Sequence, residues 1–319
     1  MCRAQRKRTG GGGGNEGRRF RQPIVTHCVR RSRKFFSENL SLRLTLSLSL
    51  CCFPGIINTN GSLWRGQRNF LMKQKMGMRT GGNVDCLKHR IQAEALGCAI
   101  SIGEYQLQQS MNLEPVLSCY VANVISSLAM STRFRHTDTE FQKFMGIFDE
   151  GFDIFNALGP VDGLPTAMHL KNTREKVDIL RKNRNTMLAF VRKIVEDHAE
   201  TLDEAAPRDL VDTYLIEARN NPESFHGVDP MEQTEQILLD LFSAGSETVR
   251  TTIMWAVVYM LHNPEHLKAV QKELDTVVGV NSMPTFDDME SLPVTRATLY
   301  EIQRMCNTVP IGVPHTNEK

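Results

Sequence analysis

The sequence lacks the cysteine spacing of a structural zinc site. Its eight cysteines stand at positions 2, 28, 51, 52, 86, 98, 119 and 306. None of them forms a CxxC pair, so neither a zinc site nor a dense disulfide framework is indicated. A chain with reduced cysteines in a compartment open to the cytosol fits this pattern best.

The sequence also lacks an uninterrupted apolar run long enough to cross a membrane. Its only candidate for a membrane or signal segment is "LSLRLTLSLSLCCFPGII", residues 40–57. Arg43 and several serines interrupt this run, and Pro54 ends it short of the roughly 20 apolar residues that a spanning helix needs. The alternation of leucine with serine is closer to the period of a strand. The segment therefore gives little indication of a membrane anchor.

Acidic residues are scarce at the start of the chain. Residues 1–34 contain eleven arginines or lysines and one acid, Glu16, although the net charge of the whole chain is only +2. With the glycine run at 10–14, this composition predicts a solvated disordered arm. Binding of this arm to nucleic acid or to an anionic membrane is the alternative. The composition changes most sharply near Pro54, which predicts an arm over 1–54 and a folded body over 55–319.

The folded body has little strand alternation and reads as a series of helices. Helices are expected at 63–78, 113–130, 139–155, 170–201 and 208–220, and two more follow Asn263 and Pro293. The clearest helix begins at Asp229 and Pro230, a cap and a first-turn proline, and ends at His262. At about 1.5 Å per residue it is about 50 Å long, so its middle must be internal.

Polar residues interrupt this long helix at its centre, in the sequence "AGSET", 244–248. Gly245 costs a helix interior about 1 kcal/mol relative to alanine, and a hydroxyl such as that of Thr248 can bond back to a preceding carbonyl. The patch therefore predicts a local widening or kink. Glu247 and Thr248 beside such a gap have the chemistry of a proton relay. The alternative, which these five residues alone favour, is a helix-packing notch with Glu247 in solvent.

Three other groups of side chains are candidates for a site. Glu301 and Arg304 share one helix face and can form a bidentate ion pair, although such pairs are most often exposed. Trp64 and Arg68 lie one turn apart and present two donors suited to a carboxylate or phosphate. A tryptophan that anchors an amphipathic helix beside an exposed arginine is the alternative. His315 projects from the proline-bounded segment "VPIGVPHT", where a lone histidine is more often structural.

In their order and spacing, these features resemble the cytochrome P-450 monooxygenases, and within them the microsomal group of insects. The phrases "GIINTNGSLWRGQRNFL", "DLVDTYL" and "MPTFDDMESLPVTRATLYEIQR" look most like the insect ecdysteroid 26-hydroxylase type. The resemblance covers roughly residues 55–316. It implies a mainly α fold, a fragment of the cytochrome P-450 fold built around the long central helix, with the family's beta domain largely missing.

The resemblance implies catalytic work for the central patch. Gly245 would loosen the helix over a haem so that dioxygen fits, while Glu247 and Thr248 would deliver the protons that split the O–O bond. Ala244 would lie on the cofactor side of the helix and face the substrate.

The resemblance also implies roles for the other three groups. Trp64, Arg68 and His315 would hydrogen-bond the haem propionates. Glu301 and Arg304 would form a buried structural pair on the proximal side of the haem.

One feature of the family has no counterpart in the sequence. The family ligates haem iron through a cysteine thiolate on a loop of the form F-x-x-G-x-R/H-x-C-x-G, which follows the ExxR helix. Cys306 is the only cysteine beyond Glu301, and it stands at a helix end. Cys86 lacks the phenylalanine and the basic residue and precedes the central helix. We therefore expect no metal ligand in these 319 residues, and we interpret them as the central part of a cytochrome P-450 with a non-family beginning.

The function implied by the resemblance is haem-dependent hydroxylation of a lipophilic substrate, with a steroid, in particular an ecdysteroid, as the expected substrate. Electrons are expected from NADPH through a NADPH-cytochrome reductase, at the cytosolic face of the endoplasmic reticulum membrane, and no nucleic-acid partner is expected. Two alternatives stay open. The chain is a catalytically inactive fragment that lacks the thiolate, or it is an all-α binding scaffold whose basic arm binds nucleic acid.

Overall fold

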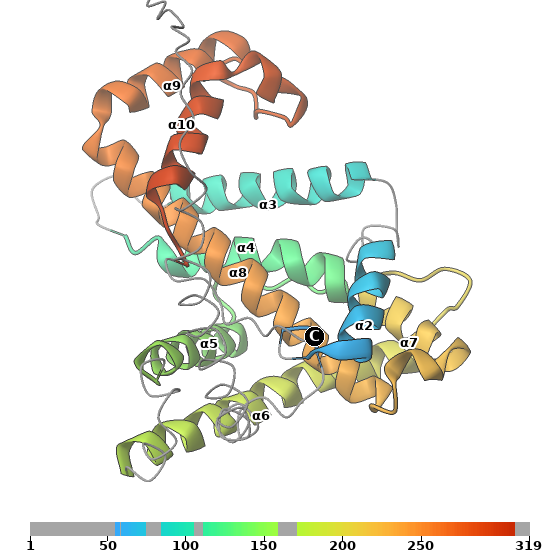
Figure 1. Cartoon of the computed structure of the whole chain (residues 1–319). Coiled ribbons are helices and arrows are strands. Elements are labelled where there is room, and N and C mark those ends of the chain that lie inside the picture. The colour runs from blue at the N-terminus through green and yellow to red at the C-terminus, as the bar shows by residue number, and fades with distance from the viewer. Residues whose placement is uncertain (1–54, 58, 75–83, 105–110, 159–170, 310–319) are drawn as a thin grey trace, which may run out of the picture. The chain divides into compact units, whose positions relative to one another are not determined.

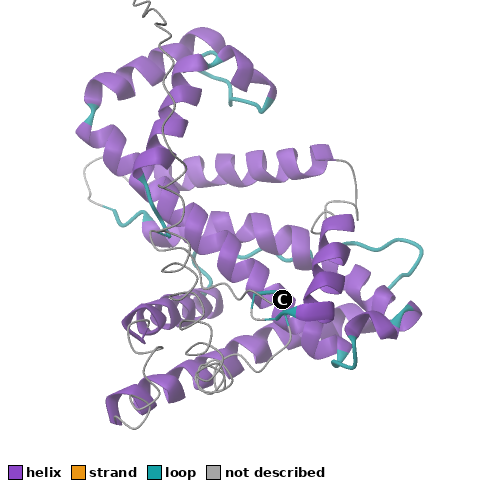
Figure 2. Ribbon diagram, in the orientation of Figure 1, coloured by secondary structure: helices purple, strands orange, loops and turns teal. Residues whose placement is uncertain are grey.

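A computed structural model describes residues 55–57, 59–74, 84–104, 111–158 and 171–309 of the chain. In these ranges every regular element is a helix and there is no strand (Figure 2). The prediction of a mainly α fold is therefore confirmed. The arm over 1–54 and His315 lie outside the described residues.

The helices follow the sequence expectations closely, with one exception. They are α2 (Gly61–Lys73), α3 (Val84–Glu104), α4 (Glu114–Met130), α5 (Thr139–Leu158), α6 (Lys171–Glu200), α7 (Leu210–Asn220), α8 (Pro230–His262), α9 (Pro264–Val277) and α10 (Pro293–Met305), with short 3₁₀ helices η3 (Pro222–Phe225) and η4 (Asp287–Ser291). Helix α3 was not predicted, because its apolar residues are spread around the helix and define no single face.

The chain divides into two compact units, Met1–Cys52 with Leu158–Val177, and Phe53–Ala157 with Asp178–Lys319. Of the first unit, the structure describes only the last residue of α5 and the first turns of α6. All the packing described below belongs to the second unit.

Helix α8 is the central element of the second unit. The Asp229 carboxylate caps it by accepting a hydrogen bond of 2.7 Å from the Met231 backbone N–H, and Pro230 occupies its first position. It then runs for 33 residues to His262. It packs against α4, α7, α9 and α10, and α4 in turn packs against α3 (Figure 1). The predicted bounds of this helix are confirmed, and its middle is internal on the side that carries Leu238 and Phe242.

Aromatic side chains join α8 to α5 and α6. The Phe242 ring lies 5.3 Å from that of Phe144 and 5.4 Å from that of Phe148, measured between centroids. Phe144 also lies 4.5 Å from Phe190 of α6. Buried aromatic pairs of this kind contribute area burial and a further 0.5–1.5 kcal/mol or so each, so this cluster fixes the packing of α5 beside the first half of α8.

No helix in the described ranges combines the length and the apolar character that crossing a bilayer requires. The candidate membrane segment at 40–57 lies almost wholly outside those ranges.

Candidate functional site

The central patch of α8 is part of an unbroken α-helix. A Cβ atom built on Gly245 would lie 2.8 Å from Cδ1 and 2.9 Å from Cγ1 of Ile125 on α4. Gly245 therefore makes the space in which α4 packs against α8. The predicted widening is absent from this structure, since the helix is α-helical from Pro230 to His262, and the predicted kink stays a prediction. The Thr248 hydroxyl donates to the Ala244 carbonyl at 2.8 Å without interrupting it.

Glu247 does not point freely into water. One of its carboxylate oxygens is ion-paired with the Arg250 guanidinium one turn further along α8. The other oxygen accepts a hydrogen bond of 3.1 Å from the Thr251 hydroxyl. The Glu247 side chain is only 29% exposed. Arg250 was not singled out from the sequence, although its i, i+3 spacing from Glu247 was a signal for the pair.

One side of α8 is left open by the described residues. Ala244 is exposed and Thr248, four residues on, is half-buried. Further along, the Trp255 ring is 45% exposed and stacks on that of Tyr259, with centroids 5.5 Å apart. The two residues predicted to face a cofactor and to donate a proton therefore lie on an accessible face, while Gly245 faces α4.

Helix α2 presents the predicted donor pair on one face. The Arg68 guanidinium carbon lies 5.7 Å from the centroid of the Trp64 ring, a cation–π arrangement. Trp64 is 37% exposed and Arg68 is exposed. Their neighbour Gln67 is buried and donates to the Ser224 carbonyl of η3 at 3.2 Å, which fixes the rotation of α2. The structure thus places both donors together on the outward side of the helix.

Glu301 and Arg304 form the predicted bidentate pair, with N–O distances of 2.8 and 2.6 Å. The expectation that this pair is buried is wrong for this structure, because the two side chains are 61% and 66% exposed. Helix α10 packs against α8, α9 and η4, and none of these elements covers the face that carries the pair. Through their hydrogen bonds the Glu301 carboxylate raises the pKa of Arg304 and the guanidinium lowers the pKa of Glu301.

Three described cysteines, Cys98, Cys119 and Cys306, are free and at least partly buried. Desolvation raises the pKa of Cys119 to about 12, and the charge of Glu94 adds to this effect. Burial also raises the pKa of Cys98. Cys306 is buried at the end of α10. A propionate would meet suitable donors at Trp64 and Arg68, whereas burial disfavours the charged thiolate form of Cys98 and Cys119, which is the form that ligates iron.

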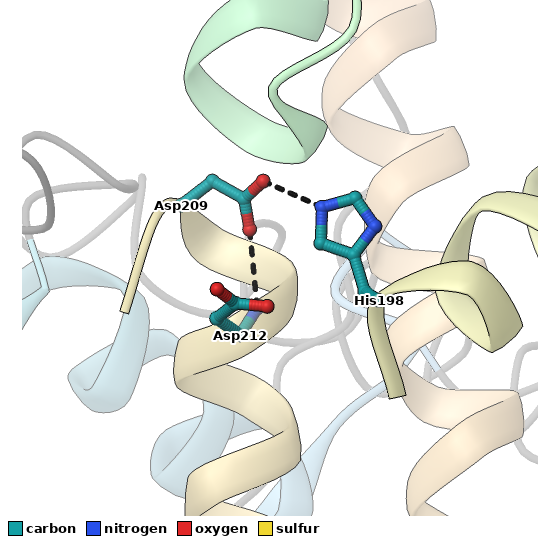
Figure 3. A group of neighbouring side chains, drawn as sticks. All are labelled: His198, Asp209 and Asp212. Atoms are coloured by element: carbon teal, nitrogen blue, oxygen red, sulfur yellow. Dashed lines mark hydrogen bonds and ion pairs between the residues drawn. The ribbon is translucent and has the colours of Figure 1, made fainter. Parts of the chain in front are cut away.

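Three buried side chains at the junction of α6 and α7 have the composition of a metal site. Ligand atoms of His198, Asp209 and Asp212 all lie within 4.8 Å of one another (Figure 3). Asp209 accepts from His198 at 2.8 Å and from the Asp212 backbone N–H at 3.1 Å. The Asp212 carboxylate accepts from the Arg208 guanidinium at 2.7 and 2.8 Å. Because the Arg208 guanidinium already binds both carboxylate oxygens of Asp212, we interpret the group as a structural contact that joins α6 to the start of α7.

A buried aspartate of α8 ties down the chain ahead of α2. Asp240 accepts hydrogen bonds from the backbone N–H groups of Ile56 at 2.7 Å and Ile57 at 3.0 Å. Gly55 has a φ of +113°, and a Cβ there would lie 2.6 Å from the Asp240 carboxylate, so only glycine fits. Desolvation raises the pKa of Asp240, and the two backbone donors only partly oppose this. No local sequence pattern indicated this contact, because its residues are 184 and 183 positions apart.

The helices and their motifs together define a class of protein. The order is the Trp64/Arg68 helix, a long central helix with AGSET, and an ExxR helix, in a domain whose described elements are all helical. The sequence model of the family described as Cytochrome P450 matches residues 21–319. The chain therefore belongs to the cytochrome P450 family.

Individual relatives agree with this assignment. Cytochrome P450 18a1 of Drosophila melanogaster is 37% identical over 273 residues, which are 82% of this chain and 50% of that protein. Cytochrome P450 2B2 of Rattus norvegicus is 32% identical over 92% of this chain and 60% of its own length. Cytochrome P450 2C8 of Homo sapiens is 32% identical over 86% of this chain and 54% of its own length.

The chain spans about half the length of the curated relatives it matches. Members of this family use haem iron and receive electrons from NADPH through a reductase. The family match begins at residue 21, inside the segment assigned to a non-family arm. The boundary near Pro54 stays a prediction.

Proposed function

We propose that this chain is the central part of a haem-thiolate monooxygenase that hydroxylates a lipophilic substrate. The observation that carries the proposal is the AGSET patch on α8, in a chain that belongs to the cytochrome P450 family. Its alcohol and acid, Thr248 and Glu247, are adjacent in sequence. Ala244 and Thr248 lie on an open side of the helix.

The residues of this chain would divide the work between holding the cofactor and moving protons. Bound haem supplies the iron chemistry that activates dioxygen in this family. Trp64 and Arg68 would bind the propionates, because an indole N–H and a guanidinium on one exposed face are matched to carboxylates. His315 is assigned to the same role. Ala244 would pack against the cofactor and the substrate.

Proton delivery would fall to Thr248 and Glu247. The Thr248 hydroxyl has one donor, which in this structure is spent on the Ala244 carbonyl, and lone pairs that accept. Glu247 would supply the proton as the acid of the pair. Glu301 and Arg304 would act as a structural pair in the full-length protein, while in this chain both are exposed and contribute little to stability.

The substrate and the partners are inferred from relatives. Several phrases of the sequence resemble the insect ecdysteroid 26-hydroxylase type, and Cytochrome P450 18a1 of Drosophila melanogaster is 37% identical. We propose a steroid, in particular an ecdysteroid, as the substrate. A NADPH-cytochrome reductase would be the electron donor, at the cytosolic face of the endoplasmic reticulum membrane.

Haem titration of the purified chain tests the cofactor part. Arg68→Ala is expected to weaken binding about ten-fold or more, because a hydrogen bond to a charged group contributes about 1.5–3 kcal/mol and 1.4 kcal/mol is ten-fold in affinity. Arg296→Ala is the matched control, since Arg296 is an exposed arginine of α10. Equal affinities for the two variants would contradict the assignment of Arg68, and absence of haem binding by the unmodified chain would contradict the proposal for these residues.

Sequencing the transcript across the codon for Lys319 tests the thiolate part. An in-frame continuation into an F-x-x-G-x-R/H-x-C-x-G loop supports the monooxygenase. A stop codon directly after Lys319 contradicts it for this product.

A catalytically inactive lipophile-binding protein is the second candidate function. The observation that favours it is that the 319 residues contain no loop of the form F-x-x-G-x-R/H-x-C-x-G. An iron–CO spectrum with the thiolate signature, recorded on this polypeptide, would eliminate this candidate.

A further inference from the structure

The Arg250 side chain, next to the central patch, forms ion pairs with three carboxylates. It is 9% exposed and lies one turn beyond Glu247 on α8. Besides Glu247, its guanidinium contacts Asp149 of α5 at 3.1 Å and Glu114 of α4 at 3.3 Å. It also donates to the Ser118 hydroxyl of α4 at 3.1 Å. One cation is therefore held by three helices at once.

This arrangement fixes the guanidinium in position and leaves its carboxylates only partly neutralised. Desolvation lowers the pKa of Arg250, but the hydrogen bond to Glu247 and the charges of Asp149 and Glu247 outweigh it, so the group stays charged. One positive charge faces three negative ones. The excess negative charge favours the arrival of protons from water.

The three carboxylates around Arg250 differ in their exposure to the solvent. Their side chains are 29% exposed at Glu247, 43% at Asp149 and 50% at Glu114. Glu247 is thus the innermost of the three, and the two outer groups belong to α5 and α4. A proton donor inside a protein needs a route to the solvent to be recharged after each transfer.

We propose that Arg250 is a positioning residue for Glu247, holding its carboxylate as the inner end of a proton-supply cluster completed by Asp149 and Glu114. Each proton that Glu247 gives up is replaced from water by way of an outer carboxylate, so the charge of the cluster is restored. This inference rests on the proposed function, because it takes Glu247 to be the acid of the central patch. It explains why a buried arginine stands three residues after that acid.

The first test measures the position of the carboxylate directly and needs no bound cofactor. In the chain labelled with ¹³C-glutamate, the infrared difference between the unmodified protein and Glu247→Gln isolates the carboxylate bands of Glu247. Arg250→Met is expected to move these bands, and Arg250→Lys to restore most of the original positions. Bands that stay in place in Arg250→Met would show that Arg250 does not position Glu247.

The second test uses the haem-loaded full-length protein and measures hydroxylated product and hydrogen peroxide. The fraction of consumed oxygen that ends in hydroxylated product is the product share. Glu247→Gln is expected to lower the product share about 100-fold, the lower limit for a general acid. Arg250→Met is expected to lower it by up to about 100-fold, the loss that misplacing a reacting group by about 1 Å brings. If Arg250 acts through Glu247, the double variant is no worse than Glu247→Gln alone. Additive losses would contradict the proposal.

Two comparisons separate the possible failures. If Glu247→Gln has no effect on the product share, the proposed function of the central patch is wrong. If Glu247→Gln has its effect and Arg250→Met does not, only the role of Arg250 is wrong.

A variant without its outer carboxylates keeps the proposal testable if Arg250→Met does not fold. The combination of Glu114→Gln with Asp149→Asn changes only half-exposed side chains. It is expected to lower the product share at least ten-fold, while Asp153→Asn, an exposed acid one turn further along α5, leaves it unchanged. An unaltered product share without both outer carboxylates would overturn the supply path.

Discussion

Gly245 of α8 lies directly against Ile125 of α4, with no space between them for a β-carbon. The interruption of the long apolar run thus has a structural cause that is independent of any chemistry. A small residue at a helix crossing lets the two backbones approach closely, and α4 and α8 pack tightly against each other. The glycine of the central patch serves packing on one side, while Ala244 and Thr248 are presented on another.

Gly245→Ala is therefore expected to destabilise the chain. Its new methyl group would stand 2.8 Å from Cδ1 of Ile125. Overpacking of this kind costs about 1–3 kcal/mol, against a gain of about 1 kcal/mol from the better helix propensity of alanine. The net loss is measured as a lower urea midpoint.

Gly146→Ala on α5 is the matched control, because nothing lies within 4 Å of a Cβ built there. It is expected to stabilise the helix by up to about 1 kcal/mol. Adding Ile125→Val to Gly245→Ala removes Cδ1 and should recover part of the loss. Equal effects of the two glycine substitutions would show that α4 does not approach α8 as described.

Stability is expected to depend on pH through His198. Its Nδ1 lies 2.7 Å from the Ile194 carbonyl and its Nε2 lies 2.8 Å from Asp209, so both ring nitrogens face acceptors. Desolvation lowers the pKa of His198, but Asp209 and the carbonyl outweigh it and leave the pKa above 6.5. The folded state thus binds this proton more tightly than the unfolded state. The stabilisation is complete below pH 6.5 and is lost as the pH rises through the folded pKa.

Urea unfolding at a series of pH values between 5.5 and about 8.5 measures this dependence, a range chosen around the usual pKa of histidine. The unfolding free energy of the unmodified chain is expected to fall across it. His198→Gln should remove that part of the slope, since its amide does not titrate. A slope identical in the two proteins would mean that folding does not shift the pKa of His198.

Asp240→Ala is expected to loosen the segment ahead of α2. Two backbone N–H groups, of Ile56 and Ile57, lose their acceptor. Leaving partly buried donors unpaired costs about 1–3 kcal/mol, and hydrogen exchange at Ile56 should accelerate. Asp240→Asn keeps one carbonyl oxygen and should lose less. Asp275→Ala, at an exposed position of α9, is the control. An equal acceleration of exchange at Ile56 in this variant would show that the Asp240 carboxylate does not hold the segment.

Glu301→Gln is expected to leave the urea midpoint of this chain unchanged. The pair with Arg304 is solvent-exposed on α10, where water replaces a lost partner. Thr295→Val on the same helix is expected to lower the urea midpoint, because it removes the hydrogen bond of 2.7 Å that the Thr295 hydroxyl donates to Glu273 of α9. A marked destabilisation by Glu301→Gln would show that the pair is covered in solution.

The sequence predicted the helical elements well because their signals are local. Asp229, Pro230 and Asn263 mark the ends of α8 by cap and turn chemistry, which depends on a few neighbouring residues. Helix α3 was not predicted because its apolar residues do not lie along one face of the helix. Its packing against α4, which a local pattern does not record, is what defines its buried side.

The candidate site residues could be predicted from the sequence, but the residues that contact them from other helices could not. Trp64 and Arg68 meet on one face of α2 because a turn separates them. The neighbours of Gly245 and of Arg250 come from α4 and α5, more than a hundred positions earlier. Spacing along one helix carries no information about such partners. The exposed position of Glu301 likewise depends on which elements cover α10.

The exposure of both tryptophans determines what fluorescence reports in this protein. The chain has two, Trp64 and Trp255, and they are 37% and 45% exposed on α2 and α8. Their emission spectra therefore resemble those of water-exposed indoles even in the folded state, and a red shift is a poor measure of unfolding. The same indoles stand on the faces assigned to the cofactor, so a bound porphyrin would quench them by energy transfer. Ligand uptake is thus readable from intrinsic emission without any label.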